Sequence, residues 1–308
     1  MDRRRRRTHA LAGLAAALVA SAAPAADVPL AAMRWLALGA DPVAKLTQEP
    51  TECLAPPADP ALARSVEVGR AAFRTPLLLG GQAARAGISC ESCHRAGRAN
   101  PDFRFPGVSG APGTADVTSS LFSSHRGNGV DDPKPIPDLS GPRAALKVAP
   151  GNVAPFVRGL IVEEFDGPEP SPAVLQGLAD YVRALGPQAC PTSATRPLSA
   201  QDLMADVRRA AAAAQAAEDT KTAIFLVTAT RARLFLLDER YARLAAEQGA
   251  LRRADRELAD IAQALREARP DARMQLARWQ ARTPILEARL RRAERRSLLD
   301  SKTLAAAL

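Results

Sequence analysis

The chain has 308 residues, of which 47% are hydrophobic and 24% are charged, so wholesale disorder is excluded and there is room for two domains. Aromatic residues make up only 4%, and any core must therefore be built mainly from Ala, Leu and Val. Once the N-terminus is set aside, no apolar run reaches the roughly 18 residues of a membrane-spanning helix, which argues against an integral membrane protein.

The formal net charge of +9 is concentrated near the two ends of the chain. Residues 1–7 carry a net charge of +4, and residues 199–308 hold 21 basic and 15 acidic side chains, a net charge of +6. The stretch between them holds 16 basic and 17 acidic side chains. The overall basic balance therefore reflects the two ends and is not by itself a signal of nucleic-acid binding.

The N-terminus has the organisation of a secretory signal peptide. Arg3 to Arg7 form a positive segment, Ala10 to Ala23 form a short apolar stretch, and Ala23-Pro24-Ala25 supplies a small-residue cleavage site. We predict a signal peptide over residues 1–25, with an uncleaved anchor as the alternative. Export places the mature chain in the periplasm, an oxidising compartment in which cysteines pair.

Two short helical segments are predicted before the first chemical motif. The N-terminal extension, residues 26–52, is rich in Pro and Ala and has room for one or two helical turns around Trp35. Residues 65–73 then form a short helix in which Gly69 and Phe73 stand four apart and share a face.

The run Cys90-Glu91-Ser92-Cys93-His94 matches C-x-x-C-H, the attachment sequence of c-type haem. Two thiols at this spacing each reach one vinyl group of the same porphyrin, and the following imidazole lies beneath the iron. We therefore expect one covalent haem c on Cys90 and Cys93, with His94 as the proximal iron ligand. A thioredoxin-like redox pair would need a βαβ context, and a zinc site would need two further Cys or His within about thirty residues; the sequence offers neither.

The segment after this motif is predicted to be loop. Residues 95–155 contain eight Gly and nine Pro with little periodicity, which is typical of a loop that wraps the edge of a cofactor. Residues 172–185 form the next helix, which Gly186-Pro187 ends. Its expected buried face consists of Leu175, Leu178, Tyr181, Val182 and Leu185.

The two predicted helices on either side of the motif resemble a known family. Gly69-x-x-x-Phe73 and Leu178-x-x-Tyr181-Val182 resemble the packed first and last helices of the class I cytochrome c fold. Residues 69–93 and 112–121 are similar to one haem domain of the bacterial di-haem cytochrome c peroxidases. The resemblance covers about 53–190 and implies a cytochrome c-like haem domain there. Because the chain has no second C-x-x-C-H, it is not by itself a di-haem enzyme.

The resemblance also raises the question of the second axial ligand. Cytochrome c electron carriers use a Met from the loop after the haem motif, but all four Met of this chain lie outside 95–190. The candidate in that loop is His125, 31 residues after His94, and bis-His ligation also occurs in the resembled peroxidases. Alternatively, His125 is a solvated loop residue and the open iron position binds small ligands or peroxide. Further candidates for the ligand are Lys134, Lys147, Met33 and Met204.

A peroxidase-like site would also need a proton shuttle near the distal oxygen of the peroxide. Two adjacent carboxylates, Glu163 and Glu164, precede the last helix of the haem domain and are candidates for that role. The alternative is a solvated acidic patch around the start of that helix.

Cys53 and Cys190 lie at the two ends of the predicted haem domain. In an exported protein two such cysteines most often pair, so we predict a disulfide that joins the start of 53–190 to its end. The alternative is two free or intermolecular thiols.

Residues 191–197 are interpreted as a linker and residues 198–308 as a helical domain rich in Ala, Leu, Arg and Glu. Ser199 is the expected N-cap, and Asp202 takes the third helical position. Apolar residues then recur at steps of three and four, until Arg269-Pro270-Asp271 breaks the helix. We expect two or three long helices in an antiparallel hairpin or small coiled-coil bundle. The expected apolar seam is Val227, Leu234, Leu237, Tyr241, Leu244, Leu251, Leu258, Ala262 and Leu265, and Leu198 and Leu203 form the hydrophobic staple at the start.

This helical domain carries no chemical motif. Its Arg residues are interleaved with Glu and Asp, which is typical of a solvated, salt-bridged helix surface. The alternatives are docking to an acidic protein or to an anionic membrane surface, and oligomerisation through the tail. Nucleic acid is not expected as a partner, because no aromatic platform is interleaved with the basic residues.

Together these features predict a mainly α-helical, exported monohaem c-type cytochrome that exchanges single electrons with a redox partner protein. The sequence favours an electron carrier over an enzyme. The alternatives are a peroxidase-like or ligand-sensing haem protein, and a haem subunit of a larger redox complex.

Overall fold

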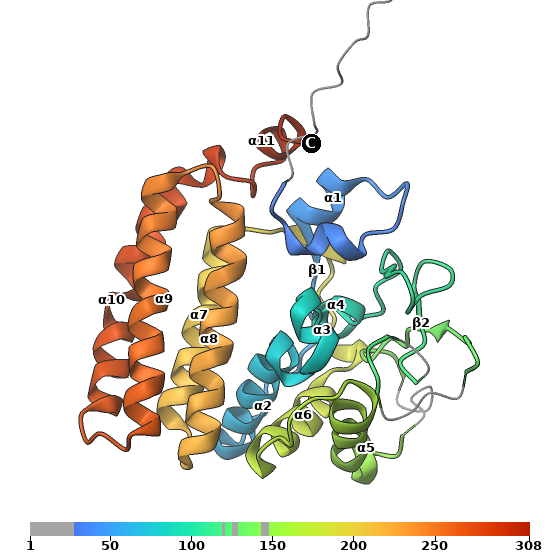
Figure 1. Cartoon of the computed structure of the whole chain (residues 1–308), viewed down its shortest axis with the longest axis horizontal. Helices are drawn as coiled ribbons and strands as arrows, with labels where there is room; N and C mark the ends of the chain where they lie inside the picture. Colours follow the sequence, from blue (N-terminus) through green and yellow to red (C-terminus); the bar gives the residue numbers. More distant parts are fainter. Residues whose placement is uncertain (1–27, 119–120, 125–128, 143–147) are drawn as a thin grey trace, which may run out of the picture.

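The computed structural model describes residues 28–118, 121–124, 129–142 and 148–308, so the predicted signal peptide lies outside the described residues. This part of the chain is mainly α-helical, as predicted, and Figure 1 shows the long helices α7 to α10 side by side, next to shorter helices and loops. None of its helices combines the length and apolar character that a bilayer crossing requires. The α-helices are α1 (Pro42–Thr47), α2 (Pro60–Phe73), α3 (Gly81–Ala86), α4 (Cys90–Cys93), α5 (Val153–Gly159), α6 (Pro172–Ala184), α7 (Ala200–Ala216), α8 (Thr220–Arg240), α9 (Ala245–Arg266), α10 (Ala272–Ala293) and α11 (Ser301–Ala305). The strands are β1 (Gln48–Pro50), β2 (Thr114–Ala115), β3 (Lys134–Pro135) and β4 (Thr195–Pro197), and the short 3-10 or π turns are η1 (Ala31–Trp35), η2 (Pro76–Leu78), η3 (Arg95–Gly97), η5 (Pro150–Asn152), η6 (Leu160–Glu164), η7 (Pro187–Ala189) and η8 (Glu294–Arg296).

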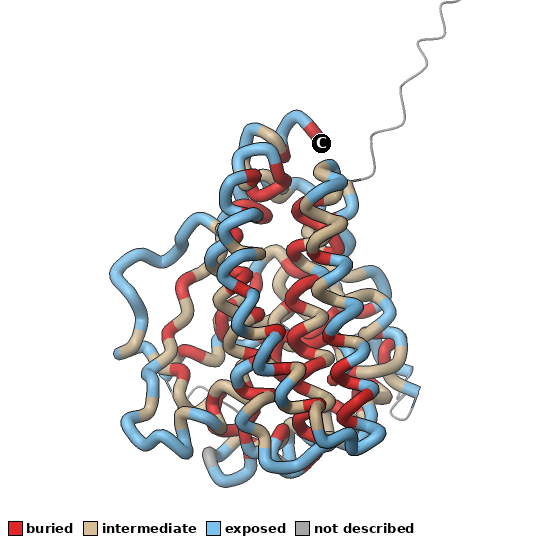
Figure 2. Tube along the Cα trace, turned by 90° about the vertical axis from the view of Figure 1, so that its left-hand side faces the viewer, coloured by how far each residue is buried: buried red, intermediate tan, exposed pale blue. Residues whose placement is uncertain are grey.

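Helices α7 to α10 form a four-helix arrangement in which each helix packs against the next and α10 returns to α7. The start of α7 is as predicted, because the Ser199 hydroxyl accepts a hydrogen bond from the backbone N–H of Asp202 at 3.2 Å. The core between the helices is built mostly from Leu and Ala, with Tyr241 and Trp279 as its large aromatic residues. Figure 2 shows buried residues running along these helices between exposed stretches.

The prediction of two or three long helices was wrong, because this region contains four in the described chain. The chain turns at residues 217–219 and again at 241–244. The predicted apolar seam therefore belongs to two successive helices, α8 and α9, whose inward residues share one core. The apolar spacing in the sequence continues across the turn at 241–244, because Tyr241 and Leu244 also pack against that core. The spacing therefore gives no sign that one helix ends there and another begins. The predicted end of the next helix at Arg269-Pro270-Asp271 is confirmed, since α9 ends at Arg266 and α10 begins at Ala272.

Helices α2 and α6 cross with their backbones in direct contact at two glycines. A Cβ atom added to Gly69 would lie 1.8 Å from the carbonyl oxygen of Gly177, so no larger residue fits this crossing. Farther along the contact, the rings of Phe73 and Tyr181 meet edge to face with centroids 5.1 Å apart. The predicted shared face of Gly69 and Phe73 is therefore confirmed.

Both helices begin at a polar cap that is followed by proline. The Asp59 carboxylate accepts a hydrogen bond from the N–H of Leu62 at 2.7 Å, and Ser171 caps α6 in the same way. Because of this cap, α2 begins at Pro60, five residues before the predicted helix 65–73. The predicted start of α6 is confirmed.

The buried face of α6 is rotated slightly from the predicted one. Leu178 and Tyr181 are buried as expected, whereas Leu175 and Val182 are only half-buried. The rotation follows from the crossing with α2, because α6 turns Gly177 toward that helix and Val174 into the core.

The predicted loop over 95–155 is confirmed for most of its described residues, and the exceptions are η3, the short β2–β3 ladder, η5 and the start of α5. Apolar side chains of this loop contribute to a hydrophobic core, although the loop has little regular secondary structure. Phe103, Val108 and Phe122 are almost completely buried and join a second core with residues of α2 and α6.

The two ends of the described chain are tied together. Strand β1 pairs with β4, with Gln48 opposite Pro197 and Glu49 opposite Arg196. Helix α11 packs against α1, and leucines from both ends form a small third core. The segment 191–197, predicted as a linker, thus contains a strand, and the predicted extension 26–52 supplies its partner.

Candidate functional site

The C-x-x-C-H motif folds into a single helical turn, α4. The N–H of Ser89 donates to the hydroxyl of Ser92 at 3.1 Å, which closes the start of the turn. At its end, the N–H of His94 donates to the carbonyl of Cys90 at 2.8 Å. Cys90 and Cys93 stand three apart on this turn, so their side chains share one face, and both are free thiols.

Both thiols are held in their neutral form. Burial raises the pKa of Cys90 to about 12 and raises the pKa of Cys93 even further. Reactive cysteines of disulfide exchange or nucleophilic catalysis require a lowered pKa, because the thiolate is the reactive species. The surroundings of these two thiols therefore argue against a thioredoxin-like redox pair.

The ring of His94 is oriented by a carbonyl group from the loop that follows. Its Nδ1 lies 3.0 Å from the carbonyl oxygen of Pro137, so the ring donates Nδ1–H there and keeps the Nε2 lone pair free. Burial lowers the pKa of His94 to about 4, which keeps the ring neutral. A neutral imidazole held through one nitrogen is the usual state of a histidine that binds a metal through the other.

Apolar side chains from several segments surround this turn. Cys90 and Cys93 pack against the second core, which includes Phe73 of α2, Phe103 of the loop and Tyr181 of α6. The ring centroid of Phe73 lies 6.3 Å from that of His94. Chemically, two free thiols and a neutral imidazole on one turn can hold a porphyrin through two thioether bonds and one axial nitrogen, and an apolar wall can cover its faces.

The second residue of the motif, Glu91, fixes the path of the chain after it. Its Oε1 accepts a hydrogen bond from the N–H of Ala96 at 2.9 Å. Ala96 and Gly97 both have positive φ, 53° and 76°, so the chain leaves the motif through a left-handed turn. A Cβ atom on Gly97 would lie 2.5 Å from the Leu185 side chain, which is why the turn ends in glycine.

Arg74 connects this motif to the long helices. Its guanidinium is buried and lies 3.5 Å from Glu91, 3.1 Å from Glu52 and 3.1 Å from Asp206 of α7. Burial opposes ionisation, yet Asp206 and Glu52 raise the pKa of Arg74 well above its usual value. Burial likewise opposes the charge on Asp206, but Arg74 and Arg209 lower its pKa to about 2. Sequence analysis missed this network, because its members are far apart along the chain and form no local pattern.

The sequence candidates for the distal side of the site are only partly described. His125 and Lys147 lie outside the described residues. Glu163 and Glu164 lie in the π turn η6, where Glu164 is buried and the Glu163 carbonyl accepts a hydrogen bond from Ser123 at 2.9 Å. The backbone of η6 thus lies beside Ser123, and the outcome for His125 lies outside the described residues.

The methionines of the described chain lie in other parts of the molecule. Met204 is completely buried in the core of the long helices, and Met33 packs against the third core at the chain ends. Met274 is exposed on α10. The alternative ligand Lys134 is exposed and paired with Asp132. These positions do not support Met33 or Met204 as an iron ligand.

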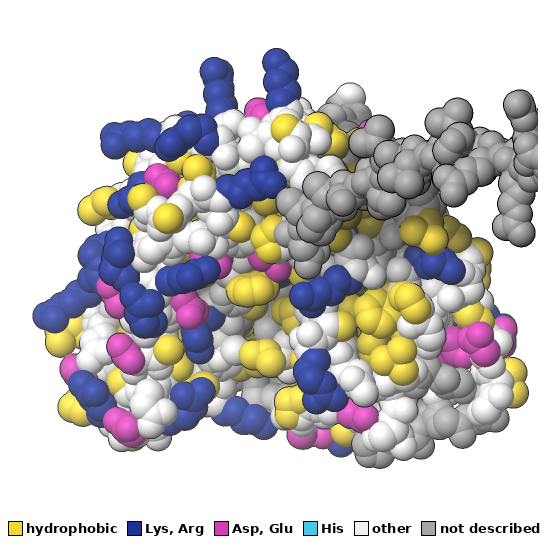
Figure 3. All heavy atoms as spheres, turned by 45° about the horizontal axis from the view of Figure 1, so that its top comes forward, with side chains coloured by type: hydrophobic (Ala, Val, Ile, Leu, Met, Phe, Trp, Pro, Cys, Tyr) yellow, Lys and Arg dark blue, Asp and Glu magenta, His cyan; other side chains and the backbone are white. Residues whose placement is uncertain are grey.

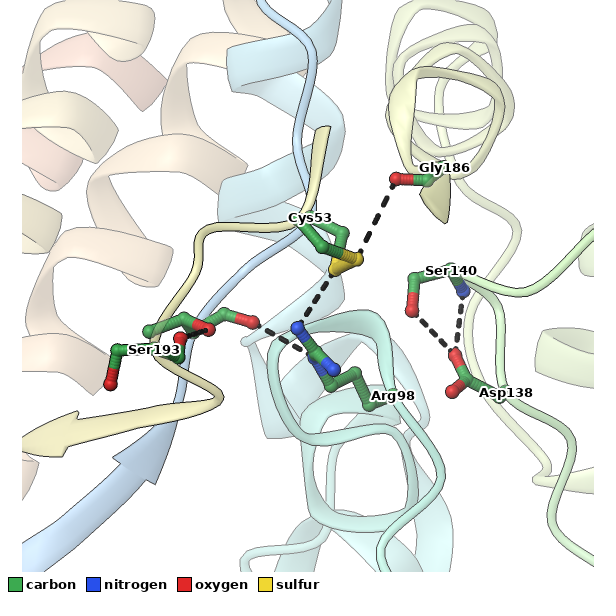
Figure 4. The surroundings of a disulfide bond; sticks show 8 residues. Cys53, Arg98, Asp138, Ser140, Gly186 and Ser193 are labelled. Carbon is green, nitrogen blue, oxygen red and sulfur yellow. Dashed lines mark hydrogen bonds between the residues drawn. A yellow bond between two sulfur atoms is a disulfide. The ribbon is translucent and has the colours of Figure 1, made fainter. Parts of the chain in front are cut away.

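The predicted disulfide between Cys53 and Cys190 is confirmed. Figure 4 shows Arg98 lying against the disulfide, with a guanidinium nitrogen 2.9 Å from the Cys53 sulfur. The same side chain donates to the Thr51 carbonyl at 2.9 Å. The bridge joins residues 137 apart and so connects the chain before α2 to the chain after α6.

Comparison with known proteins found no match among family models, curated proteins or solved structures.

Proposed function

We propose that the protein is an exported monohaem c-type cytochrome that transfers single electrons. The observation that carries the proposal is the hydrogen bond from Nδ1 of His94 to Pro137, directly beside two free thiols on one turn. The sequence motif alone requires only three residue types at a fixed spacing. In the structure, the two thiols also lie on the same face of α4, and the Nε2 atom of the imidazole is free to bind a metal.

In this proposal Cys90 and Cys93 form the two thioether bonds, and His94 supplies the axial nitrogen. When bound, the haem supplies an iron couple that accepts and releases one electron. The hydrogen bond to Pro137 fixes the ring orientation and makes Nε2 more basic. Apolar side chains pack around the turn, and the polarity around a redox centre influences its potential.

The packing of α2 on α6 supports a cytochrome c-like haem domain over 53–190. Both helices of the resembled pair are present, and they cross at Gly69 and Gly177. The Phe73 ring contacts Tyr181 at this crossing and also approaches His94. The crossing therefore positions the aromatic wall beside the motif.

Haem attachment is tested by replacing both motif cysteines. The protein is expressed with its leader in a host that matures c-type cytochromes, and the pyridine haemochrome spectrum is recorded. We expect the wild type to show a two-thioether spectrum and the Cys90→Ala/Cys93→Ala variant to lose covalent haem. The matched control is Cys53→Ser/Cys190→Ser, which removes the same number of thiols and should retain the haem. A normal c-type spectrum from the motif variant would refute the proposal.

A peroxidase-like or ligand-sensing haem site is the second candidate function. It is favoured by the positions of the described methionines, because Met33 and Met204 belong to other cores than the one around His94 and Met274 is exposed. Optical and EPR spectra of the oxidised wild type distinguish the two functions. Six-coordinate low-spin iron supports electron transfer, and a change to high spin in His125→Ala would identify His125 as the ligand. High-spin iron in both proteins supports the peroxidase-like or sensing function.

Electron transfer also requires a partner protein, and the long helices offer a charged surface for it. Figure 3 shows Lys and Arg side chains concentrated on the side of these helices. Several are paired with carboxylates, such as Arg231 with Asp255 at 2.7 Å. This pairing supports a solvated, salt-bridged surface, with docking to an acidic redox partner or an anionic membrane as the alternative.

A further inference from the structure

A cavity of about 580 Å³ lies on the opposite side of the motif turn from the thiols. Its wall includes Glu91 and Ser92 of α4, side chains of α8, and residues of the N-terminal segment, but not Cys90, Cys93 or His94. Cavities of this size are typical of sites for small organic molecules. Ten basic and six acidic residues line it, so its electrostatic balance favours a negatively charged occupant.

Two arginines in this wall, Arg209 of α7 and Arg233 of α8, have a buried Nε without a hydrogen-bond partner among the described residues. The Nε of Arg209 lies 3.8 Å from Glu67, whereas Arg233 has no ion pair in the described chain. The Arg233 side chain is 8% exposed, and one terminal nitrogen donates to the carbonyl of Arg74. Its Nε is buried and has no hydrogen-bond partner among the described residues. An unpaired buried donor on a cation costs more free energy than one on a neutral group, because hydration of the charge is lost as well. Burial lowers the pKa of Arg233 to about 10, because the buried guanidinium loses the hydration of its charge.

The carboxylates around Arg233 are already engaged with other partners. Asp206 and Glu91 both pair with Arg74. Glu239 accepts a hydrogen bond from the N–H of Ala31 at 3.1 Å, and burial raises its pKa to about 7. Arg240, two turns beyond Arg233 on α8, is also buried, and its pKa is lowered by burial to about 10. The cavity wall therefore includes two buried guanidinium groups, Arg233 and Arg240, that form no direct ion pair in the described chain.

Apolar side chains form the remainder of the wall. Trp35 and Leu30 come from the N-terminal segment, and Phe235 comes from α8. Phe235 is 59% exposed, which is unusual for a ring of its size, and lies at the cavity. The combination of a cationic group and an apolar wall suits an amphiphilic ligand.

We propose that this cavity binds a small organic anion, with a carboxylate or phosphate head group on Arg233 and an apolar body against Trp35 and Phe235. The head group pairs with the guanidinium of Arg233, which forms no ion pair in the described chain and whose Nε has no hydrogen-bond partner there. The site is separate from haem attachment, because it uses the other face of the motif turn. Its occupancy is therefore measurable whether or not the proposed electron-transfer function is correct.

The test is isothermal titration calorimetry on the full-length protein with three probes. Hexanoate and hexyl phosphate carry the two candidate head groups on the same chain, and 1-hexanol is the neutral control. We expect one or both anions to bind with a Kd below about 1 mM and 1-hexanol to bind at least about tenfold more weakly. Tighter binding of hexanoate identifies a carboxylate ligand, and tighter binding of hexyl phosphate identifies a phosphate ester.

The variant Arg233→Met should weaken binding of the anions by at least about tenfold. The matched control is Arg231→Met, on the same helix, because Arg231 pairs with Asp255 and does not line this cavity. If Arg233→Met does not fold, Ala232→Phe places bulk in the cavity wall without removing charge and should weaken binding equally. Equal affinity for 1-hexanol, no binding of either anion by the wild type, or unchanged binding in both variants would overturn the proposal.

Discussion

The crossing of α2 and α6 makes a prediction whose magnitude follows from one distance. In Gly69→Ala the new Cβ would lie 1.8 Å from the Gly177 carbonyl oxygen, whereas ordinary contact begins at 3.4 Å. The helices must therefore separate locally by about 1.6 Å, the difference between these distances. No side-chain rotation relieves the clash, because the atoms that the Cβ meets belong to the backbone of Gly177 and Leu178.

Two opposing contributions set the expected change in unfolding free energy. Alanine in a helix is more favourable than glycine by roughly 0.5–1 kcal/mol, since glycine loses more backbone entropy on folding. Overpacking of a tight contact costs typically about 1–3 kcal/mol, and separating the helices also pulls Phe73 away from Tyr181. We therefore expect Gly69→Ala to lower the unfolding free energy by about 1–2 kcal/mol.

The measurement is urea unfolding followed by circular dichroism, with Gly159→Ala as the matched control. Gly159 ends α5, and a Cβ there would have no neighbouring atom within 4 Å, so only the helix-forming advantage of alanine remains. This control should be as stable as the wild type or slightly more stable. Equal stability of Gly69→Ala and Gly159→Ala would refute the argument that close backbone contact holds these helices together.

Three further predictions concern the Cys53–Cys190 disulfide and two buried carboxylates, Asp206 and Glu239. Loss of the disulfide in Cys53→Ser/Cys190→Ser should lower the unfolding free energy by about 2–5 kcal/mol, because a loop closed by residues 137 apart is released. Mass spectra of a non-reduced digest of the wild type should show the two linked peptides. Two alkylatable thiols in the native protein would contradict the bridge. The pKa of Asp206 is about 2 in the folded protein against an ordinary 3.8, so its contribution of about 2 kcal/mol is present above pH 3.8 and is lost as the pH falls through 2. Asp206→Asn should therefore be less stable than the wild type at pH 6 but not at pH 2, as measured by urea unfolding, and a constant difference would contradict this origin. The pKa of Glu239 is raised to about 7 from 4.5, so the folded protein holds the extra proton and loses about 3 kcal/mol of stability as the pH rises from 4.5 to 7. Glu239→Gln should remove that decline, and an unchanged pH profile of unfolding would count against it.

Local chemistry made parts of this fold predictable from sequence. The start of α7 was predictable because a serine hydroxyl caps an N–H three residues later, within one turn. The C-x-x-C-H turn and the helix from Pro172 likewise have signals within a few residues. The disulfide was predictable from the small number of cysteines and the expected compartment.

Other parts depend on contacts that have no local signal. The turn at 241–244 interrupts a spacing that continues on both sides, because antiparallel neighbours place their apolar residues in one core. Arg74 finds Asp206 at a separation of 132 residues, and that pairing exists only after the long helices have docked. The unsatisfied Arg233 also follows from tertiary burial, since the same residue on an exposed helix face would be hydrated.

The pairing of β1 with β4 has a consequence for the order in which the chain assembles. Strand β1 precedes the C-x-x-C-H motif and its partner follows α6, so a chain that emerges from its N-terminus exposes the motif before residues 195–197 are available. The Cys53–Cys190 bridge must wait for the same segment. Until then the extension that carries β1 has no strand partner. Under the proposed function, Cys90 and Cys93 are therefore available for haem attachment before the ladder and the bridge close.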